Sequence, residues 1–122
     1  MAKKKDTRYE VSRWGRAIPY TTPTGIHTCL YNIATAAEAI GRTAQTLRKW
    51  EVSGTVPLTP FKVGGKRMYS DEHIDALVGC AEKYHIRAGV KIQDTCFSSS
   101  LYKKYQEIYD KFFTVKENEN DK

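Results

Sequence analysis

Two short helical patterns joined by a glycine-containing turn constrain the fold of this chain more than any other feature. The first pattern covers residues 32–41 and opens on Asn32, a residue type favoured at helix N-caps. Gly41 then supplies the permissive backbone that a tight turn needs, and Thr43 can cap a second helix over residues 43–51. Helical spacing gives the first helix an apolar face made of Ile33, Ala36, Ala37 and Ile40.

The second helix has two faces with different expected surroundings. Leu47 and Trp50 lie three residues apart, so they share one side of the helix and are expected to enter the core. The polar side chains elsewhere on this helix can meet a partner: Gln45, Thr46, Arg48 and Lys49. A helix-turn-helix whose second helix presents such side chains is typical of proteins that read DNA.

A glycine-tipped hairpin follows the second helix. Residues 53–57 end that helix, and prolines keep residues 55–60 extended. Gly64 and Gly65 then separate two short β-compatible runs, residues 61–63 and 66–69, which predicts a two-residue hairpin turn. The hairpin carries three cations, Lys62, Lys66 and Arg67. We call this hairpin, residues 61–69, the wing.

Two further helices are predicted after the wing. Residues 70–86 begin with Ser70 as N-cap and continue with an amphipathic pattern that should close the core. Ser98–Ser100 offers the cap of a last helix. That helix carries a heptad-like apolar stripe made of Leu101, Tyr105, Ile108, Phe112 and Val115. The stripe either packs on its own domain or forms a homodimer.

The stretch before the helices is the least regular part of the chain. Residues 1–8 are basic and polar, and can lie along phosphates or act as a solubilising tail. Residues 9–31 predict a short strand or helical turn, and then a threonine-rich loop that wraps the domain and buries Trp14, Ile18 or Tyr20. The expected organisation is an arm and loop over 1–30, a winged domain over 31–86, and a linker with a C-terminal helix over 87–122.

Charge and motif content narrow the function. The net charge is +6, and residues 1–70 hold 12 Lys and Arg against 4 Asp and Glu, while residues 71–122 hold 8 against 10. The basic half therefore coincides with the two-helix pattern, which favours a polyanionic partner. The three cysteines (Cys29, Cys80 and Cys96) are scattered, which argues against a metal site and a disulfide framework. The sequence has no long apolar run and no secretory pattern, so we expect a cytoplasmic protein without membrane contact. No cofactor or small-molecule ligand is expected. No GxxxxGK[ST], GxSxG or HExxH motif is present, so an enzyme is not expected.

The order and spacing of these pieces resemble the winged helix-turn-helix of the MerR superfamily, which includes excisionase-type and phage small-terminase-type domains. The matching segments are 31–33, Ala37, Gly41, 46–51, 54–57, 64–70 and 74–77. The resemblance implies a mainly α fold with a small β-hairpin and a C-terminal helix, and a second helix that enters the major groove of double-stranded DNA. It implies DNA contacts from Arg42, Thr43, Gln45, Thr46, Arg48, Lys49, Lys62, Lys66, Arg67 and Tyr69, with a core position as the alternative for Tyr69.

The chain departs from the family pattern in three places. Arg42 stands where an apolar turn residue is common, the C-terminal region is short, and the cysteines do not cluster as in metal sensors. The resemblance therefore favours a transcriptional regulator of phage or mobile-element type over a sensor of metals or drugs. The alternatives are an excisionase-like architectural factor, a small-terminase-like packaging subunit and, more remotely, an adaptor that binds proteins through its C-terminal helix.

Overall fold

The computed structural model describes residues 10–86 and 96–114. The basic arm over residues 1–8 and the end of the predicted stripe, Val115, lie outside these described ranges. The fold is mainly α, with a winged helix-turn-helix and a C-terminal helix, as the sequence predicts. In chain order the elements are β1 (Glu10–Ser12), β2 (Gly15–Thr21), β3 (His27–Tyr31), α1 (Ile33–Ala39), α2 (Ala44–Ser53), β4 (Phe61–Val63), β5 (Lys66–Ser70), α3 (Asp71–Lys83) and α4 (Phe97–Phe113).

The wing is one end of a larger antiparallel sheet. The five described strands lie in the order β1-β2-β3-β5-β4, so β3 joins the wing to the two N-terminal strands. The pairing of β3 with β5 places Leu30 opposite Ser70 and Tyr31 opposite Tyr69. The sequence predicted a short strand or helical turn and then a loop over residues 9–31. The structure instead forms strands over residues 15–21 and 27–31, and only residues 22–26 between them form a turn.

Pro19 is the reason that the sequence does not predict the strand β2. Proline interrupts a strand ladder because it has no backbone N–H, so it normally marks an edge or a loop. In this sheet β1 pairs only with residues 15–17, and Pro19 faces Cys29 of β3 on its other side. Among the described strands, β2 therefore has no partner on the β1 side at position 19, so a proline there breaks no ladder bond on that side.

The first three helices begin as the sequence predicts. The side chains of Asn32, Thr43 and Ser70 each accept a hydrogen bond from the backbone N–H three residues further on. Such caps satisfy a backbone donor that the helix cannot use internally, and each contributes about 1 kcal/mol. Asp71 and Glu72 occupy the first turn of α3, where the helix dipole favours acidic side chains.

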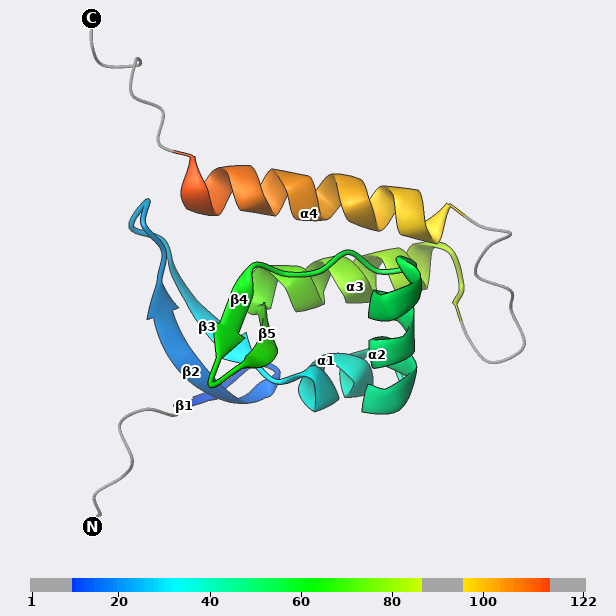
Figure 1. Ribbon diagram of the computed structural model, residues 1–122, viewed down its shortest axis with the longest axis horizontal. Helices are drawn as coiled ribbons and strands as arrows, with labels where there is room; N and C mark the ends of the chain where they lie inside the picture. Colours follow the sequence, from blue (N-terminus) through cyan, green and yellow to red (C-terminus); the bar gives the residue numbers. More distant parts are fainter. Residues whose placement is uncertain (1–9, 87–95, 115–122) are drawn as a thin grey trace, which may run out of the picture.

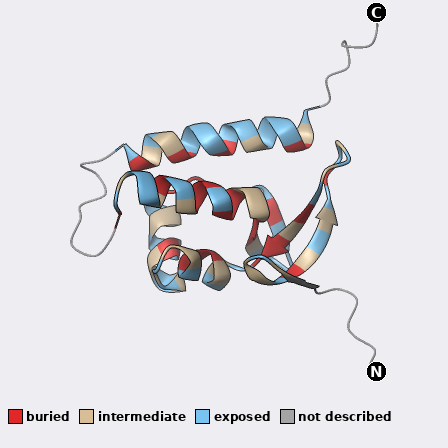
Figure 2. Ribbon diagram, turned by 180° about the vertical axis from the view of Figure 1, so that it is seen from behind, coloured by how far each residue is buried: buried red, intermediate tan, exposed pale blue. Residues whose placement is uncertain are grey.

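The core surrounds α3. Figure 2 shows buried residues concentrated along α3, which lies between α4 on one side and α1 and α2 on the other. The N-terminal strands are fastened to this helix, because the side chains of Arg13 and Trp14 both bond the carboxylate of Asp75, at 2.5 and 3.2 Å. Trp14, Ile18 and Tyr20 are partly buried and pack against the core, as expected for this stretch. The largest fully buried side chains are Tyr31, Leu47, Tyr69, Ile74, Leu77, Phe97, Leu101 and Phe112.

The last helix begins differently from the prediction that a serine caps it. Its N-cap is Cys96, which makes no side-chain cap hydrogen bond, and the three serines lie inside the first turn. Ser98 donates instead to the carbonyl oxygen of Thr55 at 2.7 Å, and the hydroxyl of Ser100 bonds that of Tyr84 at 2.8 Å. These hydroxyls fasten α4 to its domain, so the expected capping role is wrong.

The apolar stripe of α4 packs on its own domain. Leu101, Tyr105 and Phe112 are buried, and Ile108 is partly buried. The far end of the helix is held by the turn between β2 and β3, where the hydroxyl of Thr24 bonds the carbonyl oxygens of Lys111 and Phe112, each at 3.0 Å. A homodimer through these stripe residues would therefore require α4 to leave its domain.

A buried histidine sits where α3, the wing and α4 meet. His73 is 1% exposed, its Nδ1 lies 2.6 Å from the hydroxyl of Ser70, and its ring packs edge-on against Tyr105 with centroids 4.5 Å apart. Phe61 and Phe112 enclose it further. Burial lowers the pKa of His73 to about 3, so its ring is neutral at pH 7.

We expect this histidine to make the fold sensitive to mild acid. The unfolded chain takes up a proton on His73 below about pH 6.5, whereas the folded chain does not until about pH 3. The free energy of unfolding should therefore fall as the pH drops through this window, by up to about 1.4 kcal/mol per pH unit from this group. Urea unfolding of the wild type and of His73→Leu at a series of pH values checks this. The variant should show the shallower dependence, and equal slopes would contradict the assignment.

Candidate nucleic-acid interface

The turn between α1 and α2 sets the position of α2. Gly41 adopts a positive φ of 70°, and the N–H of Arg42 donates to the carbonyl oxygen of Ala37 at 2.8 Å, which closes the end of α1. The guanidinium of Arg42 then lies over the ring of Trp50, 5.5 Å from its centroid. A cation over an indole face is attracted to it, so Arg42 steadies the start of α2 as well as adding charge there.

One side of α2 is anchored in the core. Leu47 is fully buried, while Trp50 is only partly buried and packs edge-on against Phe97 of α4 with centroids 6.1 Å apart. The sequence predicts a core position for Trp50, and the structure places it at the border of the core. Its removal should therefore destabilise the fold by less than the 3–5 kcal/mol typical of a fully buried aromatic.

The opposite side of α2 faces outward along its whole length. Gln45, Arg48, Lys49 and Val52 are exposed, and their spacing of three, one and three residues places them on one face of the helix. We call these four residues the reading face. Thr43 and Thr46, also predicted as DNA contacts, lie beside it at the start of the helix, where the hydroxyl of Thr43 donates to that of Thr46 at 3.1 Å.

The wing has the turn that the sequence predicts. Gly64 and Gly65 have φ values of 59° and 80°, the positive values that a two-residue type I′ turn requires at both positions. The register pairs Phe61 with Met68, and both side chains are buried. Lys62 and Arg67 form the next pair and take the alternate face of the hairpin, while Lys66 pairs with Val63 beside the turn.

Two wing cations lie directly opposite each other. Lys62 pairs with Arg67 across the hairpin, an arrangement that is unfavourable by several tenths of a kcal/mol because like charges face each other. Arg67 is held by a 2.6 Å bond from its Nη1 to the carbonyl oxygen of Thr59, and Lys66 is exposed beside the turn. Within residues 10–86 and 96–114, no ion pair neutralises these three cations or those of the reading face, Arg48 and Lys49.

Tyr69 connects the wing to α2. It is fully buried, and its hydroxyl donates to the Glu51 carboxylate, Oε2, at 2.5 Å. Burial raises the pKa of Tyr69 well above its usual range, as do the neighbouring Tyr105 and Glu51, so this hydroxyl keeps its proton. Tyr69 therefore lies in the core, the position that the sequence allowed as the alternative to a DNA contact. Tyr69 instead fixes the strand β5 against the inner side of α2.

The wing and α2 reach the same edge of the molecule. In Figure 1 the tip of the β4–β5 hairpin and the turn between α1 and α2 both lie at the lower edge, with α1 between them. The helix α4 lies along the opposite, upper edge. The wing tip and the start of α2 thus lie at one edge, whereas α4 meets α2 only at the end of that helix, where Trp50 packs on Phe97 and Tyr102 bonds the carbonyl oxygen of Gly54.

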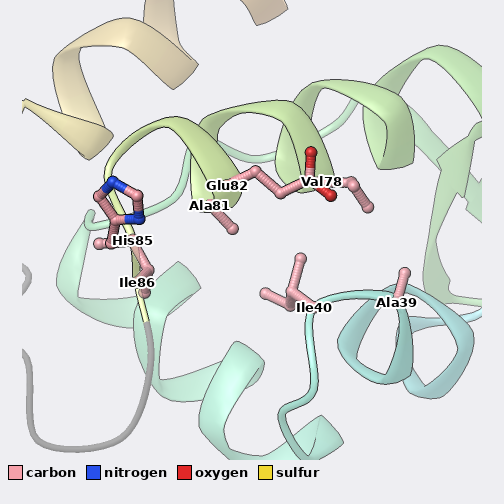
Figure 3. Close-up of a pocket in the computed structure, with 7 residues that line it drawn as sticks. All are labelled: Ala39, Ile40, Val78, Ala81, Glu82, His85 and Ile86. Atoms are coloured by element: carbon pink, nitrogen blue, oxygen red, sulfur yellow. The ribbon is translucent and has the colours of Figure 1, made fainter.

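A hollow between α1 and α3 is a different kind of surface. Figure 3 shows that it is lined mostly by aliphatic side chains, with Glu82 and His85 at separate points along its α3 side. Small-molecule sites usually bring several polar groups to bear on one ligand. This hollow is open and does not bring its two polar side chains together.

Comparison with known proteins identifies the class of the central segment. Residues 31–82 match the family model described as MerR HTH family regulatory protein. The match supports a helix-turn-helix domain of the MerR type in this segment, a type of domain found in DNA-binding regulators. A search of curated proteins and a search of solved structures each found no match. The strands β1 and β2 and the helix α4 lie outside the matched residues.

Two negative findings concern the described residues alone. None of the described helices is long and apolar enough to cross a membrane. Within residues 10–86 and 96–114, no three His, Cys, Asp and Glu side chains gather where they could hold a metal ion.

The sequence predicted no role for two residues of α2, Glu51 and Val52. Glu51 was treated only as part of the family pattern, and its bond to Tyr69 joins positions 18 residues apart, which no local signal indicates. Val52 was not considered, although its place seven residues after Gln45 and three after Lys49 puts it on the same helical face.

We expect Tyr69→Phe to destabilise the protein by about 1–3 kcal/mol, because it leaves the partly buried Glu51 carboxylate without its donor. Denaturant unfolding measures the change. The matched control is Tyr109→Phe on the exposed side of α4, which should change the stability by less than about 0.5 kcal/mol. Equal effects of the two substitutions would show that the Tyr69–Glu51 bond does not stabilise the fold.

Proposed function

We propose that the protein is a sequence-specific double-stranded DNA-binding regulator that inserts α2 into the major groove. The observation that carries this proposal is the reading face, where amide and cationic side chains project from a MerR-type helix that is anchored on its other side. A glutamine amide suits adenine, and arginine or lysine suits guanine, through the donor and acceptor pattern of the major groove. Gln45, Arg48 and Lys49 would make these base contacts.

The wing would bind the DNA backbone. Lys62, Lys66 and Arg67 carry positive charge that no acidic side chain among the described residues neutralises, and phosphates would relieve the repulsion between the facing Lys62 and Arg67. Arg42 lies beside the start of α2 and would add a phosphate contact there. The hydroxyls of Thr43 and Thr46 at the same helix end are placed to accompany it.

A second candidate is an architectural factor of the excisionase type. The apolar stripe of α4 is buried on its own domain, so the described chain offers no free helix of the kind that pairs the subunits of a MerR regulator. A monomer of this kind would bind adjacent, directly repeated sites and bend the DNA. A small-terminase-like subunit would instead form a ring.

Random-site selection on duplex DNA, with light scattering of the protein alone and bound, separates these candidates. A palindromic consensus with a dimer supports the regulator, since two-fold symmetric proteins bind two-fold symmetric sites. Tandem sites filled cooperatively by a monomer support the architectural factor, and a ring supports a packaging subunit. A protein that never binds DNA would leave only a protein-binding role for α4.

We expect removal of a reading-face cation to weaken DNA binding without unfolding the protein. Lys49→Ala and Arg48→Ala should each lower the affinity for the selected site by about 1–3 kcal/mol if the side chain contacts a base, and change the thermal midpoint little because both side chains are exposed. Lys103→Ala, which removes an exposed lysine from α4, is the matched control and should bind nearly as the wild type does. An equal loss in Lys103→Ala would mean that only net charge matters.

We also expect the affinity to depend steeply on salt. Each phosphate that a lysine or arginine neutralises contributes a slope of about −0.9 to the plot of log affinity against log salt concentration. Lys62→Ala or Lys66→Ala in the wing should reduce the slope by about one each, measured by fluorescence anisotropy. Binding that does not vary with salt would rule out the proposed backbone contacts.

A further inference from the structure

The reading face contains one residue that cannot serve as a hydrogen-bond partner. Val52 is 89% exposed, more than any other exposed large hydrophobic side chain among the described residues. Single exposed apolar residues are common on protein surfaces, so the exposure alone carries no conclusion. Its position on a helix that otherwise presents amide and cationic groups outward is what needs an explanation.

Position and helical geometry place Val52 within reach of a base edge. It lies seven residues after Gln45, so the two side chains are separated by about 10.5 Å along the helix axis. Zinc-finger helices read three successive bases with side chains spread over a similar length of helix. If α2 lies in the groove with Gln45, Arg48 and Lys49 toward the base edges, Val52 lies on the same face one turn beyond Arg48 and reaches a neighbouring base pair.

The chemical groups in the major groove determine which base edge Val52 can contact favourably. Base edges in the major groove present hydrogen-bond donors, hydrogen-bond acceptors and one apolar group, the 5-methyl group of thymine. A valine held against an amino group or a carbonyl oxygen would desolvate it without replacing its hydrogen bond, which is unfavourable. The thymine methyl is the one group there that a valine can cover with a gain in free energy.

A protein partner fits this position less well. Arg48 and Lys49 lie next to Val52 on the same face and are exposed, so the face has no continuous apolar area. Protein-docking surfaces usually present such an area, with few charges at the centre. The charge of the face instead complements a polyanion.

We propose that Val52 is a specificity-determining residue that contacts the 5-methyl group of a thymine in the DNA target. This inference rests on the proposed function, because it requires α2 to lie in the major groove. It adds a preference for thymine at the base pair next to those that Lys49 and Arg48 contact.

Replacement of thymine by uracil tests the contact directly. Uracil lacks only the methyl group and keeps the pairing and every hydrogen-bonding group in the groove. In the duplex obtained by random-site selection, each thymine is replaced singly by deoxyuridine, and the dissociation constant is measured for the wild type and for Val52→Ala. Alanine has a higher helix propensity than valine, so this exposed variant should keep its fold, which circular dichroism checks.

At one thymine position we expect the wild type to lose about three- to tenfold in affinity on replacement by uracil. Val52→Ala should bind the thymine site more weakly by a similar factor and should not distinguish thymine from uracil there. Lys49→Ala is the control, since it should bind more weakly yet keep the full discrimination.

Two results would overturn the inference, and they can be told apart. If the wild type binds its selected site but no thymine position shows a methyl effect that Val52→Ala abolishes, the contact is absent and the proposed function stands. If the wild type binds no duplex at low salt, both fail together.

Discussion

The hydrogen bond between Tyr69 and Glu51 determines how the two arms of the interface are placed. One partner belongs to the wing strand β5 and the other to α2, and the tyrosine is fully buried. A two-stranded hairpin and a ten-residue helix are each marginal on their own, so both depend on their attachment to the core. This bond joins them where the tyrosine is fully buried and the carboxylate partly so, and an unpaired hydroxyl or carboxylate there would be unfavourable. The positions of the exposed residues of α2 and the wing thus depend on buried contacts on the inner side of these two elements.

Some outward-facing residues break local rules that most of the described elements obey. The N-caps of α1, α2 and α3 and the glycines of the wing turn agree with the fold around them, whereas the wing sets Lys62 opposite Arg67 and α2 leaves Val52 in water. Proteins that are consistent elsewhere tend to violate such rules at functional sites, because the compensating partner is not part of the chain. Both exceptions lie on α2 and the wing, the two elements proposed to meet DNA.

The sequence predicts the features that depend on neighbouring residues and misses those that depend on distant ones. Asn32, Thr43 and Ser70 act as caps through bonds that span three residues, and Gly64 with Gly65 define their turn locally. The strands before α1 are different, since their identity depends on pairing with each other and with β5. The serines of α4 show the same limit, because the partner that Ser98 finds is Thr55, 43 residues earlier. For Tyr69 the residue type allowed two roles, and its full burial, with a bond to Glu51 18 residues earlier, decides between them.

The bond from Thr24 to the end of α4 joins positions 87 and 88 residues apart, outside both ends of the segment that matches the family model. Such a contact can form only after nearly the whole of this sequence has been synthesised, and it closes a long loop. A chain cut before Phe112 would retain the matched segment yet remove the ring of Phe112 from against Phe61 and His73. Exposed aromatic surface of this kind promotes aggregation and proteolysis. The additions at the two ends therefore brace each other as well as the matched segment, to which Asp75 ties the first and Thr55 ties the second.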